Sequence, residues 1–342
     1  MVDCFSEIVG HAAAKRGLLR AASTGRVHHA LLFSGRRGIG KLALARAFAQ
    51  VLLCEESQLG VGLGGLRRCG VCRHCRRIEK DGHPDFLILR PSGVYISIAQ
   101  IRQLQQDVSC NPFEARLRVV IIDDAHAMQD AAGNAILKTL EEPGSQTQFL
   151  LLTDQAHGLL PTVRSRCQVV RLAPFSWQEV CAQLVAQGRP EDLAQRVAAV
   201  AMGSPGEASS WSDSGALGEV YGFLDAMETL EDPAQAIDLA KEISGQGELV
   251  PVFLRLLSTY LRDLAVVGAC GSGAEVIHVS RREGLLERAG RVDVDTIIAA
   301  FECVEQVRRA LRGNVNQTLA LEHLIFRLRP VFGRDRMSGG SR

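Results

Sequence analysis

Short apolar runs alternate with helical patterns along the first half of the chain. Each run is apolar on consecutive residues, as expected for a strand that is buried on both faces of a sheet. The predicted strands are 30–34, 86–90, 119–123, 149–153 and 168–172, and the clearest helices are 41–53, 98–109 and 129–142. This alternation predicts an α/β domain with a five-stranded parallel sheet and helices on both of its faces.

The pattern changes at Pro174, and towards the C-terminus only helical spacing is convincing. The segments 203–206 and 209–215 are rich in helix-breaking residues and predict a domain boundary near residue 212. The two longest amphipathic helices predicted in this part are 250–267 and 294–312. We therefore expect an α/β domain followed by helical domains.

The amino-acid composition indicates a globular protein but does not indicate a specific function. The chain has 342 residues, 46% apolar and 23% charged, which is typical of a soluble globular protein with two or three domains. Its formal net charge of +1 gives no general argument for binding nucleic acid or membranes. The N-terminus lacks a secretory pattern and no apolar stretch is long enough to span a bilayer, so we expect a cytosolic protein.

Residues 35–41 read Gly-Arg-Arg-Gly-Ile-Gly-Lys, directly after a predicted strand and before a predicted helix. In this context Gly35, Gly38 and Gly40 would let backbone N–H groups approach phosphate oxygens at the positive end of the helix. Lys41 would contact the terminal phosphates of a nucleotide. The pattern therefore indicates a phosphate-binding loop, and an ordinary glycine-rich turn is the alternative.

Position 42 departs from a working phosphate loop. A Ser or Thr hydroxyl normally follows the lysine and ligates Mg²⁺, but here the residue is Leu42, which has no oxygen. The metal bridges and neutralises the phosphates during hydrolysis, so we expect ATP hydrolysis to be severely impaired. Phosphate affinity through the backbone and Lys41 remains an option.

An acidic pair follows the predicted strand 119–123. Asp123 is placed to bind a metal through water, and Asp124 stands where a catalytic glutamate would polarise the attacking water. The side chain of Asp124 is one methylene shorter than glutamate, which puts that role in doubt. A strand that ends in two solvated aspartates is the alternative interpretation.

Three of the ten cysteines lie within seven residues, as Cys69-x₂-Cys72-x₂-Cys75. This is metal-ligand spacing, and zinc prefers four tetrahedral ligands. Cys54 is the natural fourth ligand, with His74 and His83 as substitutes. Four thiolates leave no open position for water, so the pattern predicts a structural Zn²⁺ site.

Two other interpretations of the cysteine cluster stay open. A redox dithiol could form between neighbouring cysteines of the cluster. Basic side chains on its flank would offset thiolate charge, although they could also contact nucleic acid or simply be solvated. These basic residues are Arg67, Arg68, Arg73, Arg76 and Arg77.

Arg166 precedes the last predicted strand, within Ser165-Arg166-Cys167. Taken alone, it is most simply a surface or salt-bridging arginine. In a ring of phosphate-loop subunits, an arginine at this place can extend into a neighbour's site and stabilise charge on the transferred phosphoryl group.

Taken in order, these motifs resemble the AAA+ clamp-loader family, most closely its delta-prime subunits. The resemblance is strong over about residues 5–210 and extends to about residue 330. Its further motifs are His83-Pro84-Asp85, Leu137-Lys138-Thr139-Leu140-Glu141-Glu142-Pro143 and Asn314-Val315-Asn316-Gln317-Thr318-Leu319-Ala320-Leu321-Glu322.

The resemblance implies a stationary subunit of the DNA polymerase III holoenzyme. It would join the tau/gamma motor subunits and delta in a five-membered ring that opens the beta sliding clamp and loads it onto primed DNA. Arg166 would be the arginine finger for an adjacent motor subunit, and Thr153 matches the sensor position on the fourth strand. The implied domains are a nucleotide-binding-type domain over 1–172 with its zinc module at about 54–85, a helical lid over 173–211, a helical collar over 212–332 and a disordered tail over 333–342.

Two departures separate the chain from the motor subunits of that family. One is Leu42, and the other is Glu207, which lies about where a motor subunit carries a phosphate-sensing arginine. A carboxylate at that place repels phosphate, so ATP/Mg²⁺ binding by this chain is doubtful. An active AAA+ Mg-ATPase of the motor type is the alternative function. A zinc-dependent nucleic-acid-binding module is a third, weakened by the near-neutral charge and low aromatic content.

Overall fold

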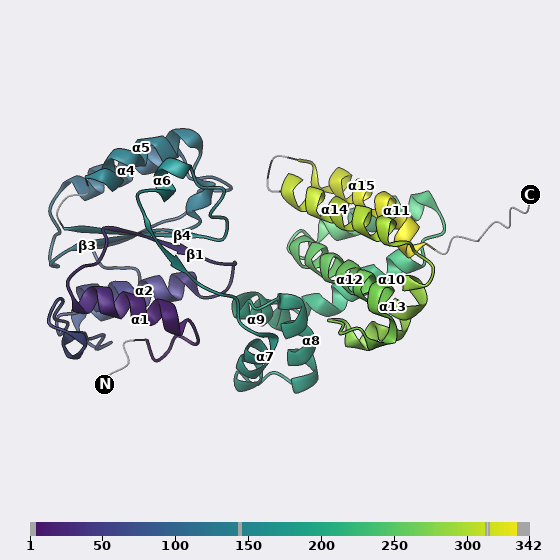
Figure 1. Cartoon of the computed structure of the whole chain (residues 1–342). Helices are drawn as coiled ribbons and strands as arrows, with labels where there is room; N and C mark the ends of the chain where they lie inside the picture. The colour runs from purple at the N-terminus through teal and green to yellow at the C-terminus, as the bar shows by residue number, and fades with distance from the viewer. Residues whose placement is uncertain (1–4, 143–145, 312, 314, 334–342) are drawn as a thin grey trace, which may run out of the picture. The chain divides into compact units, whose positions relative to one another are not determined.

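The computed structural model describes residues 5–142, 146–311, 313 and 315–333 (Figure 1). Pro143, Asn314 and the predicted tail beyond Gly333 lie outside the described residues. The chain divides into two compact units, residues 1–175 and 176–342. Apart from residues 173–175, the predicted lid and collar both fall in the second unit, so the division between them stays a prediction.

The first unit is built on a five-stranded parallel sheet, as the apolar runs predict. Its strands are β1 (Ala30–Ser34), β2 (Phe86–Leu89), β3 (Arg118–Ile122), β4 (Thr147–Thr153) and β5 (Gln168–Arg171). They are arranged in the order β2-β3-β4-β1-β5, and every neighbouring pair is parallel. This order brings the carboxyl ends of β1, β3 and β4 side by side, and ligands of α/β sheets bind at the carboxyl ends of the strands.

Helices cover both faces of the sheet (Figure 1). On one face, α1 (Ala12–Ser23) and α2 (Lys41–Leu53) pack on Leu31 and Phe33, together with Leu18, Leu44 and Phe48. On the other, α4 (Ile98–Ser109) and α5 (Asp130–Glu141) pack on Ala30 and Leu32 through a second apolar cluster. Alternate residues of β1 therefore serve opposite cores, because successive side chains of a strand point to opposite faces. The short helices α3 (Arg73–Glu79) and α6 (Pro161–Arg164) complete this unit.

Among the described residues of the second unit, all regular secondary structure is helical. Its α-helices are α7 (Trp177–Ala186), α8 (Glu191–Ala201), α9 (Pro205–Ser214), α10 (Ala216–Glu228), α11 (Pro233–Gly245), α12 (Val250–Cys270), α13 (Arg282–Ala289), α14 (Val294–Ala310) and α15 (Gln317–Phe332). The fully buried side chains of Phe253, Leu257 and Leu324 lie in its core. None of the described helices is long and apolar enough to cross a membrane.

The interpretation of 209–215 as a breaker is wrong. Residues 205–214 form α9, which begins with Ser204 as its N-cap and Pro205 in the first turn. The helix forms because Ala208 and Trp211 are buried, and that burial outweighs the low helix propensity of the serines. The helix α9 ends at Ser214, and the next residue, Gly215, has a φ of 68° and breaks the helix.

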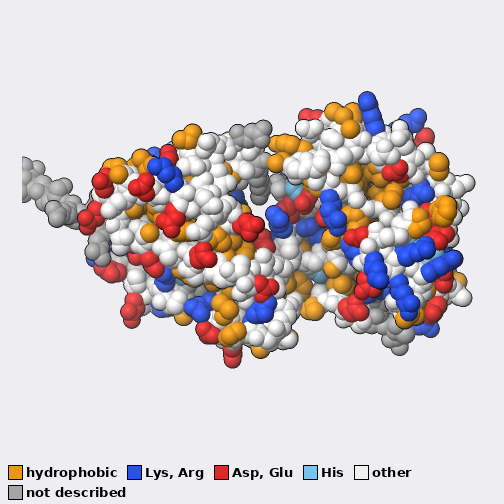
Figure 2. Space-filling view, turned by 180° about the vertical axis from the view of Figure 1, so that it is seen from behind, with side chains coloured by type: hydrophobic (Ala, Val, Ile, Leu, Met, Phe, Trp, Pro, Cys, Tyr) orange, Lys and Arg blue, Asp and Glu red, His pale blue; other side chains and the backbone are white. Residues whose placement is uncertain are grey.

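Charged side chains of both signs are scattered over the face of the molecule seen in Figure 2. On the face seen in Figure 2, Lys and Arg side chains lie among Asp and Glu side chains on both units. This mixture agrees with the formal net charge of +1.

Candidate functional site

The glycine-rich loop connects the end of β1 to the start of α2. Gly38 and Gly40 have φ of 74° and 95°, a left-handed conformation that side chains disfavour. At Gly35, a Cβ atom would lie 2.7 Å from the carbonyl oxygen of Leu172, so the chain has no room for one. The loop therefore needs glycine at these three positions to place its backbone between strand and helix.

Lys41 is the first residue of α2 and is only 8% exposed. Its ammonium donates hydrogen bonds to the carbonyl oxygens of Gly35 and Arg36, at 2.9 and 2.8 Å. Burial lowers its pKa, and this effect outweighs the opposing attraction of Asp154, Asp124 and Asp123. The lysine thus lies inside its own loop and close to three carboxylates.

Leu42, at the position of the metal-binding hydroxyl, is half-buried and packs against the apolar core beneath α2. Its side chain supplies a hydrophobic contact instead of a metal ligand. The loop therefore has the backbone of a phosphate site without the side-chain oxygen that holds Mg²⁺.

Asp123 and Asp124 follow β3 at the same edge of the sheet. Burial and the neighbouring Asp124 raise the pKa of Asp123. Asp124 has φ 47° and ψ 48°, and its N–H donates to Oδ1 of Asp123 at 3.1 Å. Arg90 lies 4.0 Å from Asp123 Oδ2.

Thr153, the last residue of β4, is fully buried beside this acidic pair. Its hydroxyl accepts the N–H of Gln155 at 3.0 Å and lies 3.3 Å from Nδ1 of His126. His126 Nε2 lies 3.5 Å from Oδ1 of Asp154. The sequence analysis assigned no role to His126 or Asp154, although Asp154 directly follows Thr153 and His126 lies two residues after Asp124.

Asp124, His126 and Asp154 offer three ligand atoms that lie within 4.8 Å of one another. Thus the carboxyl edge of the sheet brings together the phosphate loop, the acidic pair and Thr153, all from separate parts of the sequence.

Arg166 does not lie in this group. It follows α6 and is one-third exposed, at 33% of its side-chain area. Its guanidinium forms an ion pair with Glu141 at the end of α5 and donates to the carbonyl oxygen of Thr162 at 2.9 Å. Among the described residues, its hydrogen bonds and ion pair are made to Glu141, Thr162 and Ser165, and none is made to the phosphate loop.

The structure brings all four predicted cysteine ligands together. The Sγ atoms of Cys54, Cys69, Cys72 and Cys75 lie within 4.8 Å of one another, and those of Cys54 and Cys69 are 3.6 Å apart. Four sulfurs around one Zn²⁺ at about 2.3 Å are separated by roughly 3.8 Å in a tetrahedron. The spacing therefore fits a single zinc ion, with no disulfide required.

The electrostatics of the cluster also suit a metal. Burial raises the pKa of Cys75, and neighbouring thiols raise it further. For Cys72, burial also acts to raise the pKa, but hydrogen bonds from the backbone N–H groups of Cys75 and Glu55 outweigh it and the net pKa is lowered. A bound cation would stabilise all four thiolates at once.

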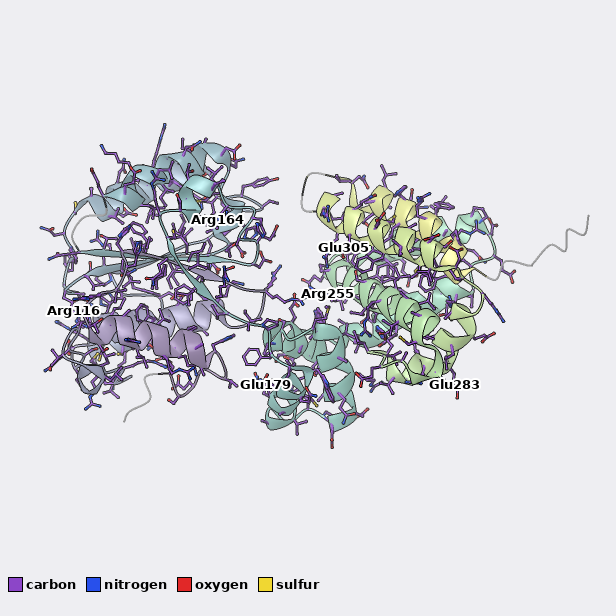
Figure 3. All side chains as sticks on the ribbon, viewed as in Figure 1. Arg116, Arg164, Glu179, Arg255, Glu283 and Glu305 are labelled. Atoms are coloured by element: carbon purple, nitrogen blue, oxygen red, sulfur yellow. The ribbon has the colours of Figure 1, made fainter. Side chains whose placement is uncertain are left out.

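The cysteine cluster is attached to the C-terminal end of α2, because Cys54 caps that helix. Arg116 reinforces the junction by donating to the carbonyl oxygens of Leu52 and Ser57, at 2.7 and 2.5 Å. Arg116 is labelled in Figure 3 beside this end of the first unit. Its positive charge lies near Cys54 and would partly offset the charge of a four-thiolate site.

His74 and His83, the substitute ligands, are occupied by one another. His74 Nδ1 lies 2.6 Å from His83 Nε2, while His83 Nδ1 accepts the N–H of Asp85 at 2.9 Å. Because Nδ1 of His83 is an acceptor, its proton is on Nε2 and is donated to His74. The two imidazoles group with Glu114 and not with the four cysteines, as a separate set of ligand atoms that lie within 4.8 Å of one another.

Glu207 is held within the second unit. Its carboxylate lies 3.9 Å from Nη2 of Arg255, which projects from α12 (Figure 3). The acidic residue at this position therefore has a basic partner of its own.

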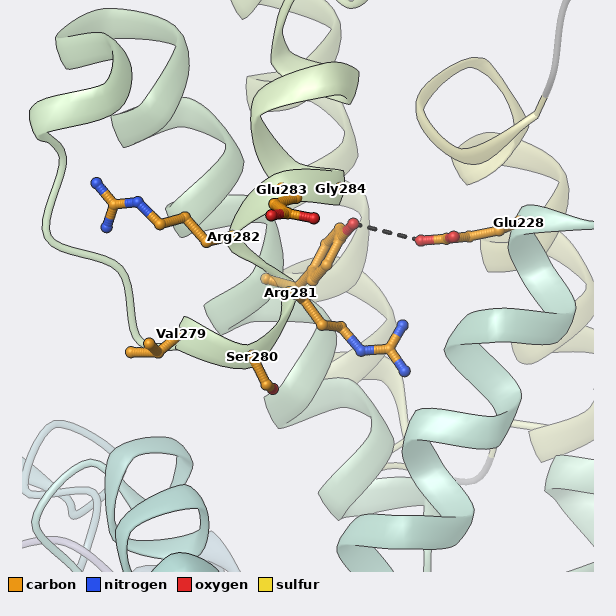
Figure 4. Close-up of a pocket in the computed structure, with 8 residues that line it drawn as sticks. Glu228, Val279, Ser280, Arg281, Arg282, Glu283 and Gly284 are labelled. Atoms are coloured by element: carbon orange, nitrogen blue, oxygen red, sulfur yellow. Dashed lines mark hydrogen bonds between the residues drawn. The ribbon is translucent and has the colours of Figure 1, made fainter.

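A cavity of about 630 Å³ opens beside Tyr260 in the second unit (Figure 4). The Tyr260 hydroxyl donates to Glu228 at 3.3 Å, and Glu228 also pairs with Arg288 at 3.0 Å. Arg281, another lining residue, is paired with Asp225. Glu228 and Arg281 therefore each have an ion-pair partner within the chain.

Comparisons with known proteins agree over most of the chain. Residues 10–176 match the family model described as DNA polymerase III, delta subunit, and residues 222–329 match the one described as its C-terminal part. The delta-prime subunit of Bacillus subtilis is 29% identical over 321 residues, which cover 89% of this chain and 91% of that protein.

Other relatives match over shorter segments. The delta-prime subunit of Escherichia coli is 37% identical over 159 residues, 46% of each chain. Escherichia coli tau is 35% identical over 215 residues, which cover 61% of this chain and 32% of tau. The matched parts thus span less than half the length of these two relatives.

Solved structures show a distant likeness. A gamma subunit-related protein of Thermotoga maritima aligns with a TM-score of 0.39 and 17% identity, covering 92% of this chain and 98% of that one. The Bacillus subtilis clamp-loader delta protein aligns with a TM-score of 0.34 and 12% identity, covering 92% and 98%. Both scores are below 0.5, so the assignment depends on the sequence matches. On those matches, the chain belongs to the delta-prime subunit family of DNA polymerase III clamp-loader proteins.

Proposed function

We propose that this chain is a stationary subunit of a clamp-loader ring, without ATP turnover of its own. It would assemble with tau/gamma motor subunits and a delta subunit in the bacterial cytoplasm, and help to load the beta sliding clamp onto primed DNA. In this role the chain contributes an arginine to a neighbouring ATP site and a helical surface to the ring.

The observation that carries the proposal is the state of the phosphate loop. Its glycines and Lys41 have the backbone arrangement of a nucleotide site, but Leu42 packs into the core where a Mg²⁺ ligand is required. Hydrolysis depends on that metal to neutralise charge on the phosphates. Asp124 also has a shorter side chain than the glutamate that would orient water. Together these features favour a site that keeps the fold of a phosphate loop and does not hydrolyse ATP.

Arg166 supplies the active contribution in this proposal. It is partly exposed on the first unit, and its bonds in the described part of the chain are made away from its own phosphate loop, as expected of a residue that serves a neighbour's site. An arginine placed against a transferred phosphoryl group raises turnover by about three to five orders of magnitude in other nucleotide hydrolases. A clamp loader could therefore control one motor site through this side chain.

The second unit offers a surface for assembly. Val294, Ile298 and Phe301 lie on one face of α14 and are each 38–49% exposed. Leu319 and Phe326 on α15 are 61% and 36% exposed. Exposed apolar residues at helical spacing are typical of helix–helix interfaces, so they support a ring contact through the collar helices. The zinc site would serve the fold of the first unit.

An active Mg-ATPase of the motor type is the alternative, and the group formed by Asp124, His126 and Asp154 is the observation in its favour. The test is Mg-ATP binding and hydrolysis by the purified chain, beside a Leu42→Thr variant. The proposal predicts no turnover by the wild type and stronger Mg²⁺-dependent nucleotide binding by Leu42→Thr. Robust Mg²⁺-dependent turnover by the wild type would make the motor-type function the better account.

A further inference from the structure

One side of the Arg166 guanidinium is hydrogen-bonded to Glu141. Its Nε donates to Glu141 Oε1 at 2.7 Å, and its Nη2 donates to the same oxygen. Its Nη1 donates to the carbonyl oxygen of Thr162 at 2.9 Å and lies 3.5 Å from the hydroxyl of Ser165. The side chain is therefore held in one orientation by its own chain.

The bonds to Glu141 leave part of the guanidinium available to bind another group. Arginine has five N–H donors, and Glu141 occupies those on the edge shared by Nε and Nη2. The second hydrogen of Nη2 has no acceptor among the residues that the structure describes. It lies at the end of the guanidinium shared with Nη1, whose own two hydrogens are donated to Thr162 and Ser165, so one N–H remains for a phosphate oxygen. The arginine can therefore contact an incoming oxyanion while it keeps its bond to Glu141.

Glu141 itself is firmly placed. It is the last residue of α5, directly after Leu140, which is completely buried in the core. The same helical turn is tied to α4, because the side-chain amide of Gln105 donates to Thr139 Oγ1 at 2.9 Å and to Ala135 O at 3.0 Å. The carboxylate that holds Arg166 thus extends from a packed part of the sheet's helical layer.

We propose that Glu141 is the positioning residue for Arg166, and that it orients the guanidinium so that its outer edge faces the neighbouring subunit's ATP. This inference rests on the proposed role of Arg166 in trans. Donors that are oriented before the reaction stabilise a transition state without the cost of ordering them during it. An arginine without this partner samples many rotamers, so fewer molecules present the correct edge.

The size of the effect follows from the exposure of the pair. Arg166 and Glu141 are 33% and 47% exposed, so their attraction is strongly screened by solvent. A partly exposed ion pair of this kind changes an equilibrium by up to about fivefold. Loss of Glu141 should therefore lower turnover at the neighbouring site by about this factor, far less than loss of Arg166 itself.

The experiment uses the reconstituted clamp loader with primed DNA and clamp, and measures kcat and KM for ATP. Glu141→Ala is compared with Glu141→Gln, which keeps the accepting oxygen, and with the matched control Glu142→Ala. Glu142 is the adjacent exposed carboxylate, and it makes no contact with Arg166 in the described part of the chain. Arg166→Ala, alone and combined with Glu141→Ala, completes a double-mutant cycle for the two residues.

We expect Glu141→Ala to lower kcat by about fivefold with an unchanged KM, Glu141→Gln to recover most of it, and Glu142→Ala to match the wild type. In the Arg166→Ala background, Glu141→Ala should cause no further loss. An undiminished kcat in Glu141→Ala, or an equal loss in both backgrounds, would overturn the role of Glu141 alone. Normal turnover in Arg166→Ala would instead remove the trans role, and this inference with it.

Discussion

Asp85 is expected to be one of the most sensitive positions of the first unit. Its side chain is completely buried and accepts hydrogen bonds from the backbone N–H groups of Phe113, Glu114 and Ala115, at 2.6, 2.8 and 2.9 Å. Arg118 lies 3.3 Å from the same carboxylate. One buried charge therefore fixes the loop that leads from α4 into β3.

Asp85→Asn keeps the shape of the side chain but replaces one acceptor oxygen with an NH₂ group. That group would face N–H donors, and Arg118 would lose its buried counter-charge. Hydrogen bonds to a charged group contribute about 1.5–3 kcal/mol each, and breaking a buried ion pair costs about 3–5 kcal/mol. We therefore expect the free energy of unfolding of the first unit to fall by about 4 kcal/mol at pH 7.

The pKa of Asp85 supports the sign of this effect. Burial acts to raise it, but the hydrogen bonds from Glu114, Phe113 and Ala115 and from Arg118 outweigh burial, so the net pKa is lowered. A carboxyl whose pKa is lower in the folded state stabilises the fold above its unfolded pKa, and this stabilisation is lost as the pH falls through the folded value. The difference between wild type and Asp85→Asn should therefore be full at pH 7 and shrink below about pH 4.

The assay is hydrogen–deuterium exchange of the full chain, read by mass spectrometry on peptides that cover residues 113–122. A loss of about 4 kcal/mol corresponds to a roughly thousandfold faster exchange of the β3 amides. Asp107→Asn is the control, because Asp107 is exposed and its carboxylate accepts a side-chain bond only from Gln103 among the described residues. Exchange of β3 within about threefold of the wild type would refute this reasoning, since 1.4 kcal/mol already changes it tenfold.

Three further predictions concern the metal and the second unit. Metal analysis should return about one zinc per chain, and Cys75→Ser should abolish it; a folded wild-type protein without metal would contradict the assignment. Arg116→Met should release zinc to a chelator about tenfold more readily than the wild type, whereas Arg102→Met, an exposed control, should not. Burial lowers the pKa of His278 to about 4. Between about pH 4 and pH 6.5 this imidazole is therefore protonated in the unfolded chain and neutral in the folded chain. Urea unfolding followed by tryptophan fluorescence should show about 2 kcal/mol less stability at pH 5 than at pH 7, a difference that His278→Asn should remove.

The strands and the longest helices could be predicted because their signal is local. Consecutive apolar residues mark β1 and β3 to within one residue, and Lys41–Leu53 forms the helix expected after the glycine loop. The cysteine spacing likewise indicated which four side chains would meet. In each case a pattern within a few residues decides the outcome, because the period of the backbone fixes which side chains are buried.

Contacts between distant segments could not be predicted in this way. The ion pair of Glu141 with Arg166 joins the end of α5 to the turn after α6, and Arg116 is bonded to carbonyl groups about sixty residues earlier in the chain. Both contacts depend on the sheet order, in which β4 lies between β3 and β1. A reading of sequence alone gives the strands without their neighbours. The error at 209–215 has a similar cause, because burial of Trp211 outweighs local propensity.

The most direct test of the account is steady-state ATP hydrolysis by the reconstituted clamp loader that contains Arg166→Ala in this subunit, with primed DNA and clamp present. Gel filtration of the same preparation would establish that the ring is assembled. The account predicts an intact ring in which DNA- and clamp-stimulated hydrolysis falls, because one motor site has lost the arginine that stabilises its transition state. Hydrolysis at the wild-type rate in an intact ring would contradict it.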